Sequence, residues 1–132
     1  QLDKRFSLFK KNVVILGFTF KKDTDDIRDS LVPKIYRYIK RKIPRKIKIS
    51  DHNLGNKIKF EDSSECLKNY SINEALEDAD CVIIAINHSG YKEELLKFIK
   101  YNPELWVADL WNICETNMVY YQLKDIKLRN SK

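Results

Sequence analysis

The chain has 132 residues, of which 43% are hydrophobic and 33% are charged, and its formal net charge at pH 7 is +6. This length predicts a single domain whose core needs no disulfides. No apolar stretch approaches the roughly 20 residues of a membrane span, and no signal peptide begins at Gln1. The spacing of Cys66, Cys81 and Cys114 matches no zinc or redox pair. We expect a cytoplasmic domain with free thiols, no metal and no membrane partner.

Much of the positive charge lies in one segment, residues 40–48, which surrounds a predicted helix end and the next strand. Cations there favour the helix carboxyl terminus, and the others are expected to be solvated. We therefore predict no nucleic-acid partner. A basic nucleic-acid-binding domain stays as an alternative, which a salt titration against oligonucleotides tests.

The first predicted elements are a helix end and a buried strand. Leu2, Phe6 and Phe9 stand at helical spacing without a start signal, so residues 1–11 are predicted to end a linker helix from a missing upstream part. A strand is predicted over residues 12–18, because its four-residue aliphatic run is typical of a strand buried on both faces of a parallel sheet. The run reaches Gly17 and opens into a charged loop at the carboxyl end of the strand, where open α/β sheets bind ligands.

Strands and helices then alternate along the chain. Asp29 or Ser30 is predicted to cap a helix that ends before Pro44, and Ser71 with Glu74 has the spacing of a capping box. The remaining predicted elements are strands over 46–50, 58–60, 81–86 and 105–110 and helices over 71–79, 91–101 and 118–123. This order predicts an α/β, Rossmann-like three-layer domain with a mostly parallel sheet over residues 12–132.

Residues 17–30 read GFTFKKDTDDIRDS and resemble the signature that opens the carboxyl-terminal UDP-binding domain of UDP-glucose/GDP-mannose dehydrogenases. The order of elements fits that domain as far as residue 126. The resemblance implies a UDP-sugar-binding domain of an NAD-dependent nucleotide-sugar 6-dehydrogenase, of the UDP-glucose or UDP-N-acetylhexosamine type, in polysaccharide biosynthesis. Such an enzyme oxidises the C6 alcohol to a carboxylate, binds NAD mainly on an upstream dehydrogenase domain, and is a homodimer or larger.

The resemblance also implies roles for individual residues. Lys21 is expected to contact the nucleotide sugar, and Phe20 either lines its pocket or belongs to the core. Arg28 is expected to reach the dinucleotide on the preceding domain, to form a salt bridge with its flanking carboxylates, or both. His88 lies in a loop that resembles the family's loop after this strand and is expected to border the nucleotide site. Trp111 stands where many members have arginine, and it either stacks on the ligand or packs.

Other sequence features limit what this chain does alone. Asp51 follows the second strand, but no Gly-x-Gly-x-x-Gly follows the first, so we interpret Asp51 as a turn residue and expect no NAD binding by this domain by itself. The family's catalytic cysteine belongs to a Gly-Gly-Ser-Cys-Phe type motif, which is absent. We therefore predict no catalytic residue here and no activity in isolation. The alternative is a stand-alone, non-catalytic nucleotide-sugar-binding module.

Overall fold

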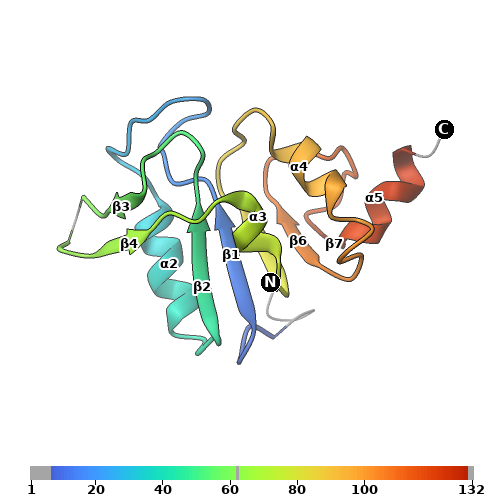
Figure 1. The fold of residues 1–132 in the computed structure, drawn as a ribbon, viewed down its shortest axis with the longest axis horizontal. Helices are drawn as coiled ribbons and strands as arrows, with labels where there is room; N and C mark the ends of the chain where they lie inside the picture. Colours follow the sequence, from blue (N-terminus) through green and yellow to red (C-terminus); the bar gives the residue numbers. More distant parts are fainter. Residues whose placement is uncertain (1–6, 62, 131–132) are drawn as a thin grey trace.

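The structure, a computed structural model, describes residues 7–61 and 63–130 of the chain and side chains through residue 126. Its main sheet has five strands in the order β2-β1-β5-β6-β7, and the first four of these are parallel (Figure 1). The strands are β1 (Asn12–Leu16), β2 (Lys46–Ser50), β5 (Cys81–Ile84), β6 (Trp106–Asp109) and the antiparallel β7 (Tyr120–Gln122). The mostly parallel α/β sheet predicted from the sequence is confirmed.

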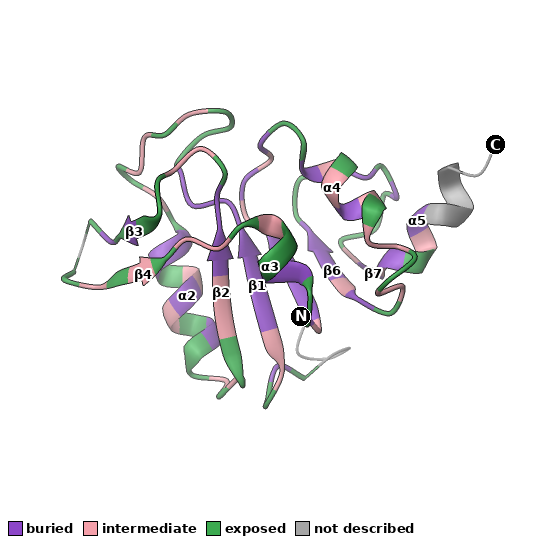
Figure 2. Cartoon of the chain, in the orientation of Figure 1, coloured by how far each residue is buried: buried purple, intermediate pink, exposed green. Residues whose placement is uncertain are grey.

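Helices cover both faces of this sheet, which gives the predicted three layers. Helix α2 (Val32–Lys40) packs on one face, and α3 (Ile72–Leu76), α4 (Tyr91–Lys97) and α5 (Leu123–Asn130) lie on the other. Successive residues of β1 point to opposite faces. Val13 and Ile15 join the core under α2, whereas Val14 and Leu16 join the core under the other three helices. Figure 2 shows buried residues running through the central strands.

Strand β1 lies between β2 and β5, and the later strands are added on both of its sides. The chain passes through α2 to β2 on one side, and later returns to β5 on the other side. The carboxyl ends of β1 and β5 therefore form a topological switch point, the place where sheets of this kind bind ligands. The loops after these two strands are the ones that the sequence marks as functional.

Two parts of the chain differ from the expected elements. The helix predicted for residues 118–123 is wrong: Tyr120–Gln122 pairs with β6, and α5 begins only at Leu123. The register sets Tyr121 opposite Val107, where its ring is buried under the helices. A separate hairpin joins β3 (Lys57–Lys59) to β4 (Cys66–Lys68), and only its first strand was anticipated.

The linker helix predicted for residues 1–11 does not extend over residues 7–11. Residues 7–11 form a loop and a turn rather than a helix, although Leu8 is buried in the core under α2. The rest of the predicted linker helix falls on residues 1–6, outside the described residues. Among the helices that the structure describes, none has the length and apolar character needed to cross a membrane.

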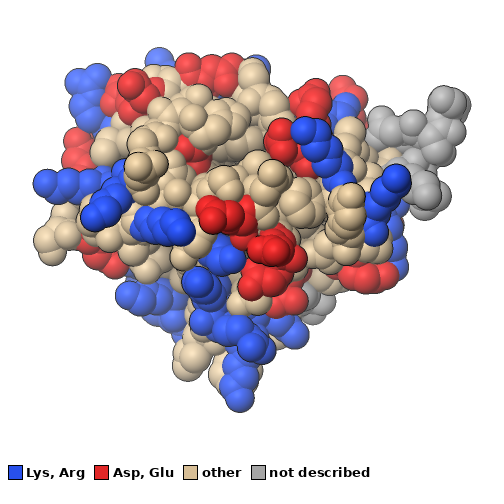
Figure 3. Space-filling view, in the orientation of Figure 1, with Lys and Arg blue, Asp and Glu red and all other residues tan. Residues whose placement is uncertain are grey.

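Strand β2 is an outer strand, and its outer edge is partly covered. Ile49 forms a parallel bridge with Asn69, and the Tyr70 N–H donates to the Ile49 carbonyl at 3.0 Å. The uncovered half begins at Lys46 and includes Lys48. Figure 3 shows lysine and arginine gathered at the lower end of the view, where β1 and β2 begin, at the opposite end of the sheet from the switch point.

Candidate functional site

Gly17 brings the loops after β1 and β5 into close contact. Its φ of +95° lies in the left-handed region, and a Cβ added to it would stand 2.8 Å from the Ile86 Cβ and 3.0 Å from the Ile86 nitrogen. A side chain does not fit between the two loops at this point. The glycine therefore allows β1 to end beside β5 and the following residues to turn over the end of the sheet.

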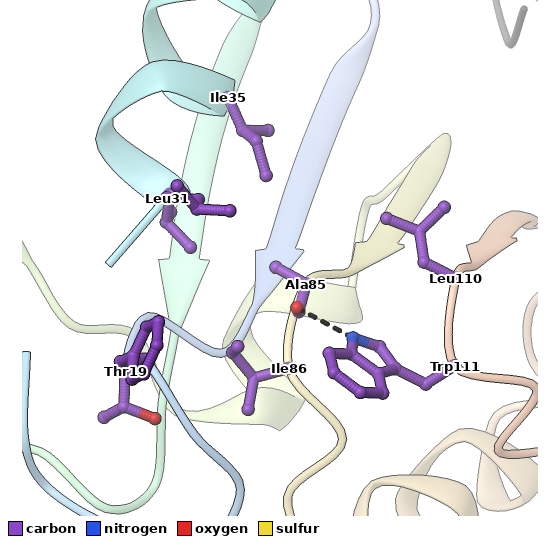
Figure 4. Close-up of a pocket in the computed structure, with 9 residues that line it drawn as sticks. Thr19, Leu31, Ile35, Ala85, Ile86, Leu110 and Trp111 are labelled. Atoms are coloured by element: carbon purple, nitrogen blue, oxygen red, sulfur yellow. Dashed lines mark hydrogen bonds between the residues drawn. The ribbon is translucent and has the colours of Figure 1, made fainter. Parts of the chain in front are cut away.

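A cavity of about 500 Å³ opens at the switch point (Figure 4). It lies between the start of α2 and the loops that follow β1, β5 and β6. Its lining is mainly apolar and consists of Thr19, Phe20, Leu31, Val32, Ile35, Ala85, Ile86, Leu110 and Trp111. Pockets of a few hundred cubic ångströms with apolar walls are typical small-molecule sites.

Large apolar side chains stand exposed around this cavity. Phe20 is 48% exposed, Leu31 63%, Leu110 55% and Trp111 50%. The alternative that Phe20 belongs to the core is therefore wrong, because its ring lines the cavity and keeps about half of its surface open. Exposed apolar side chains grouped at a pocket, rather than scattered singly, mark a surface that contacts a ligand or another protein segment.

Trp111 links the loops after β5 and β6. Its indole N–H donates to the Ala85 carbonyl at 2.9 Å, and one face of the ring is left to the cavity (Figure 4). Two roles were considered for Trp111, stacking on a ligand and packing. The hydrogen bond fixes the ring against the loop after β5, and half of its surface stays open, so stacking on a ligand stays a prediction.

Buried Asp109 fixes the turn that carries Trp111. Its carboxylate accepts the N–H groups of Ile113 at 2.9 Å and Cys114 at 3.2 Å, and the Tyr121 hydroxyl at 2.6 Å. Burial, together with the hydrogen bond to Asp109, raises the pKa of the Tyr121 hydroxyl, so it remains a donor. The turn after β6 is thus anchored to β7.

Lys21 and Lys22 lie at the exposed tip of the loop after β1. The Thr19 hydroxyl donates to the Lys21 carbonyl at 2.7 Å, which fixes the backbone immediately after Phe20. Within the described part of the chain, the Lys21 ammonium has neither a hydrogen bond nor an ion pair. The structure thus brings Lys21 next to the cavity-lining Phe20 with its positive charge uncompensated by a direct partner.

Arg28 forms a two-pronged ion pair with Asp26. Its Nε donates to Asp26 Oδ1 at 2.9 Å and its terminal nitrogen donates to Asp26 Oδ2 at 2.8 Å. The hydrogen bonds from Arg28 lower the pKa of Asp26 to about 2. The internal salt bridge expected for Arg28 is confirmed. The Arg28 side chain is still 76% exposed, and its approach to a dinucleotide stays a prediction.

His88 lies beneath the loop after β1 rather than in the cavity wall, and its side chain is fully buried. Its Nδ1 accepts the Asp23 N–H at 2.8 Å, and its Nε2 lies 3.0 Å from Asp51 Oδ2 and 3.2 Å from the Thr19 hydroxyl. The ring of His52, distant in sequence, stacks nearby at a centroid distance of 5.5 Å. That His88 borders bound nucleotide stays a prediction.

Asp51 has a larger role than the turn that the sequence suggested. It does begin a turn, because its carboxylate accepts the Asn53 N–H at 2.9 Å. It is also fully buried and accepts the Phe18 N–H at 2.7 Å. Although burial disfavours its charge, the hydrogen bonds from His88, Phe18 and Asn53 hold its pKa below the usual value. Asp51 therefore ties β2 to the start of the loop after β1.

Ser89 completes the support of this loop. Its N–H and its hydroxyl donate to the two oxygens of the Asp23 carboxylate at 2.8 and 2.7 Å. These bonds lower the pKa of Asp23, whose φ of +56° is left-handed. Sequence reasoning missed Asp51, Asp23 and Ser89 as supports. The available signal was their place in the loops that follow three neighbouring parallel strands, where polar side chains converge.

The cysteines lie away from this network. Cys81 and Cys114 are buried, and burial raises the pKa of their thiols to about 12 and about 11. Cys66 is exposed on β4. Among the described residues, no three His, Cys, Asp or Glu side chains are arranged to hold a metal ion.

Residues 14–116 match the sequence profile described as the UDP-glucose/GDP-mannose dehydrogenase family, UDP binding domain. Comparison with curated proteins gave no match. Among solved structures, a UDP-D-ManNAc dehydrogenase from Pyrococcus horikoshii is similar, with 22% identity, a TM-score of 0.57, and coverage of 75% of this chain and 21% of that one. A GDP-mannose dehydrogenase from Pseudomonas aeruginosa has 20% identity, a TM-score of 0.54, and coverage of 79% and 24%. The chain thus spans about a quarter or less of these proteins and shares their fold over that part.

Proposed function

Because the chain belongs to the UDP-glucose/GDP-mannose dehydrogenase family through its UDP binding domain, we propose that its cavity binds the UDP part of a nucleotide sugar. The parent protein is then an NAD-dependent dehydrogenase that oxidises the sugar C6 alcohol to a carboxylate. The observation that carries the proposal is the position of the cavity: it lies at the switch point, and the family's signature loop forms one of its walls.

The lining of the cavity suits the parts of a UDP-sugar. Phe20 and Trp111 present aromatic surface on which a uracil ring packs. The diphosphate carries negative charge, and the exposed ammonium of Lys21 follows Phe20 directly along the loop. Leu31, which precedes α2, and Ile35 within α2 supply the apolar wall across the cavity (Figure 4). In this arrangement the chain binds and orients substrate, and an upstream dehydrogenase domain supplies the reacting groups.

NAD fits this domain poorly. A dinucleotide cradle needs several glycines after the first strand, and Gly17 is the only glycine among the first fifty residues. The space beside its Cα is taken by Ile86, so this glycine serves the contact between the loops after β1 and β5. We therefore assign NAD to the upstream domain of the parent. Arg28, held as a fork by Asp26 and mostly exposed, is the residue of this chain proposed to reach it.

The test compares two neighbouring lysines in the full-length parent. Lys21→Ala removes a charge-assisted contact of roughly 1.5 to 3 kcal/mol, which weakens UDP-sugar binding about tenfold to more than a hundredfold. Lys22→Ala removes the same charge from the same loop and is expected to change binding by no more than about 0.5 kcal/mol. Titration calorimetry with UDP-glucose measures both. Equal affinities, or the larger loss for Lys22→Ala, would show that the assignment is wrong.

A further inference from the structure

We propose that His88, as a neutral imidazole protonated on Nε2, is the positioning residue that holds the Phe20–Lys22 segment in its ligand-binding shape. This inference rests on the proposed function, because it assigns that segment to the nucleotide-sugar site. It gives His88 a role other than direct ligand contact, since the ring is buried beneath the loop and is absent from the cavity lining.

The imidazole joins the two ends of the segment. On one side, Nδ1 accepts the N–H of Asp23, the residue that follows Lys22, at 2.8 Å. On the other side, Nε2 lies 3.2 Å from the hydroxyl of Thr19, the residue that precedes Phe20. The three residues between these points have exposed side chains. One buried ring therefore fixes both anchors of an exposed tip.

The hydrogen-bond partners determine the protonation state of His88. A backbone N–H only donates, so Nδ1 must be the unprotonated acceptor toward Asp23. The ionised Asp51 carboxylate only accepts, so Nε2 must carry the proton. The Thr19 hydroxyl already donates to the Lys21 carbonyl, which leaves its oxygen to accept from Nε2. All these contacts are satisfied together only by the neutral form with the proton on Nε2.

Protonation of Nδ1 conflicts with this arrangement. The new N–H would face the Asp23 N–H at 2.8 Å and the Asn53 amide nitrogen at 3.3 Å, which are both donors there. One alternative acceptor is Asp23 Oδ1, 3.9 Å from Nδ1, but that oxygen accepts from Ser89. The loop would have to shift to bring this oxygen within hydrogen-bond distance of Nδ1. A charged His88 ring is therefore incompatible with the observed loop.

The other charged and titratable groups around His88 come from three segments. Asp51 lies at the end of β2, His52 follows it, Tyr91 begins α4, and Lys22 acts on Asp23 from the loop itself. The two carboxylates favour a positive ring, whereas the two facing donors oppose one. Acidification is therefore expected to break the hydrogen bond from the Asp23 N–H to His88 and to favour an ion pair between the charged ring and a carboxylate. The loop then loses its observed shape.

The first experiment measures the pH dependence of UDP-glucose binding to the full-length parent. UDP-glucose is a suitable probe because its diphosphate diester keeps its charge between about pH 5 and pH 8, so a change in affinity over this range comes from the protein. Wild-type affinity is expected to fall about tenfold as the pH drops through this range, which corresponds to one hydrogen bond. His88→Asn places an amide oxygen near the Nδ1 position, does not titrate, and is expected to give a flat profile. His52→Asn removes the neighbouring imidazole and is expected to keep the wild-type profile.

A double-mutant cycle separates positioning from a general effect on folding. If His88 acts through the loop tip, His88→Asn must weaken binding less in the Lys21→Ala background than in the wild type, since the contact that it positions is already gone. Strictly additive losses overturn the proposal, as does a His88→Asn profile identical to that of the wild type. Absence of UDP-glucose binding by the wild type at about pH 8 instead overturns the proposed function.

A direct readout remains if the His88→Asn variant fails to fold. Nitrogen-15 chemical shifts of the imidazole in the wild-type protein distinguish a protonated from an unprotonated nitrogen. We expect the His88 ring to be protonated on Nε2 alone at neutral pH and the Asp23 amide to be protected from hydrogen exchange. A proton on Nδ1 at neutral pH contradicts the inference whatever the variants do.

Discussion

At Gly17 the backbone conformation and the nearest neighbour exclude any side chain. We predict that Gly17→Ala lowers the free energy of unfolding by roughly 2 to 5 kcal/mol, because it adds left-handed strain to a clash with Ile86. Gly55→Ala is the matched control, since a Cβ there meets no heavy atom within 4 Å. Its effect is expected to stay within about 0.5 kcal/mol. Urea unfolding of both variants measures the difference, and equal effects would contradict the packing at Gly17.

The Asp26 carboxyl offers a second test at this scale. Its pKa of about 2 lies below the ordinary value of 3.8 because Arg28 binds the charged form. The pair therefore supports the folded loop at pH values above about 4, and this support is lost as the pH falls toward about 2. In an NMR titration, Arg28→Gln is expected to return the Asp26 pKa toward 3.8. Arg45→Gln removes a charge elsewhere and is expected to leave it unchanged.

Single residues were predictable where one local motif defines them and less so where partners come from distant segments. The Arg28 fork follows from carboxylates two residues away, and Phe20 follows from the signature loop. The buried contact between His88 and Asp51 joins residues 37 positions apart. Each looks like an ordinary loop residue by itself, and only the parallel arrangement of β1, β2 and β5 brings them together.

At the scale of elements, β7 holds the end of the chain through Tyr121. Its buried hydroxyl donates to Asp109 at 2.6 Å. We predict that Tyr121→Phe costs roughly 1 to 2 kcal/mol of unfolding free energy, because it leaves a buried carboxylate oxygen short of one donor. Tyr120→Phe, on the neighbouring half-buried ring, is expected to cost less than about 0.5 kcal/mol. Urea unfolding that ranks the two variants in the opposite order would contradict the role of this contact.

The central strands were predictable because their apolar runs are unmistakable, but the outer elements were not. Residues 13–16 and 81–84 are apolar and buried throughout, as a strand covered on both faces requires. Strand β4 has only three residues, and two of them are exposed, so its sequence shows no apolar run. It forms because it pairs with β3. Strand β7 is equally short and forms because β6 offers it a free edge, a tertiary influence that local propensity does not contain.

At the scale of the whole molecule, the fold decides which thiols react. Cys81 and Cys114 are buried and hold their protons well above neutral pH, whereas Cys66 is exposed. We predict that an alkylating reagent at about pH 8 labels Cys66 in the native protein and all three cysteines after denaturation. Mass spectrometry of the labelled peptides provides the measurement. Native labelling of Cys81 at the rate of Cys66 would contradict the buried position of β5.

The partly uncovered edge of β2 affects how separate molecules meet. Its open backbone is a template on which another chain could add a strand, and such contacts lead to aggregation. Arg45 and Lys46 are exposed at the start of that half, directly after Pro44, whereas the Lys48 side chain is mostly buried and paired with Asp78 at 3.1 Å. Two copies approaching edge to edge would set like charges against each other beside a proline, which has no N–H to contribute. Arg45 and Lys46 therefore disfavour extension of the sheet into a polymer, which gives this part of the positive charge a structural role.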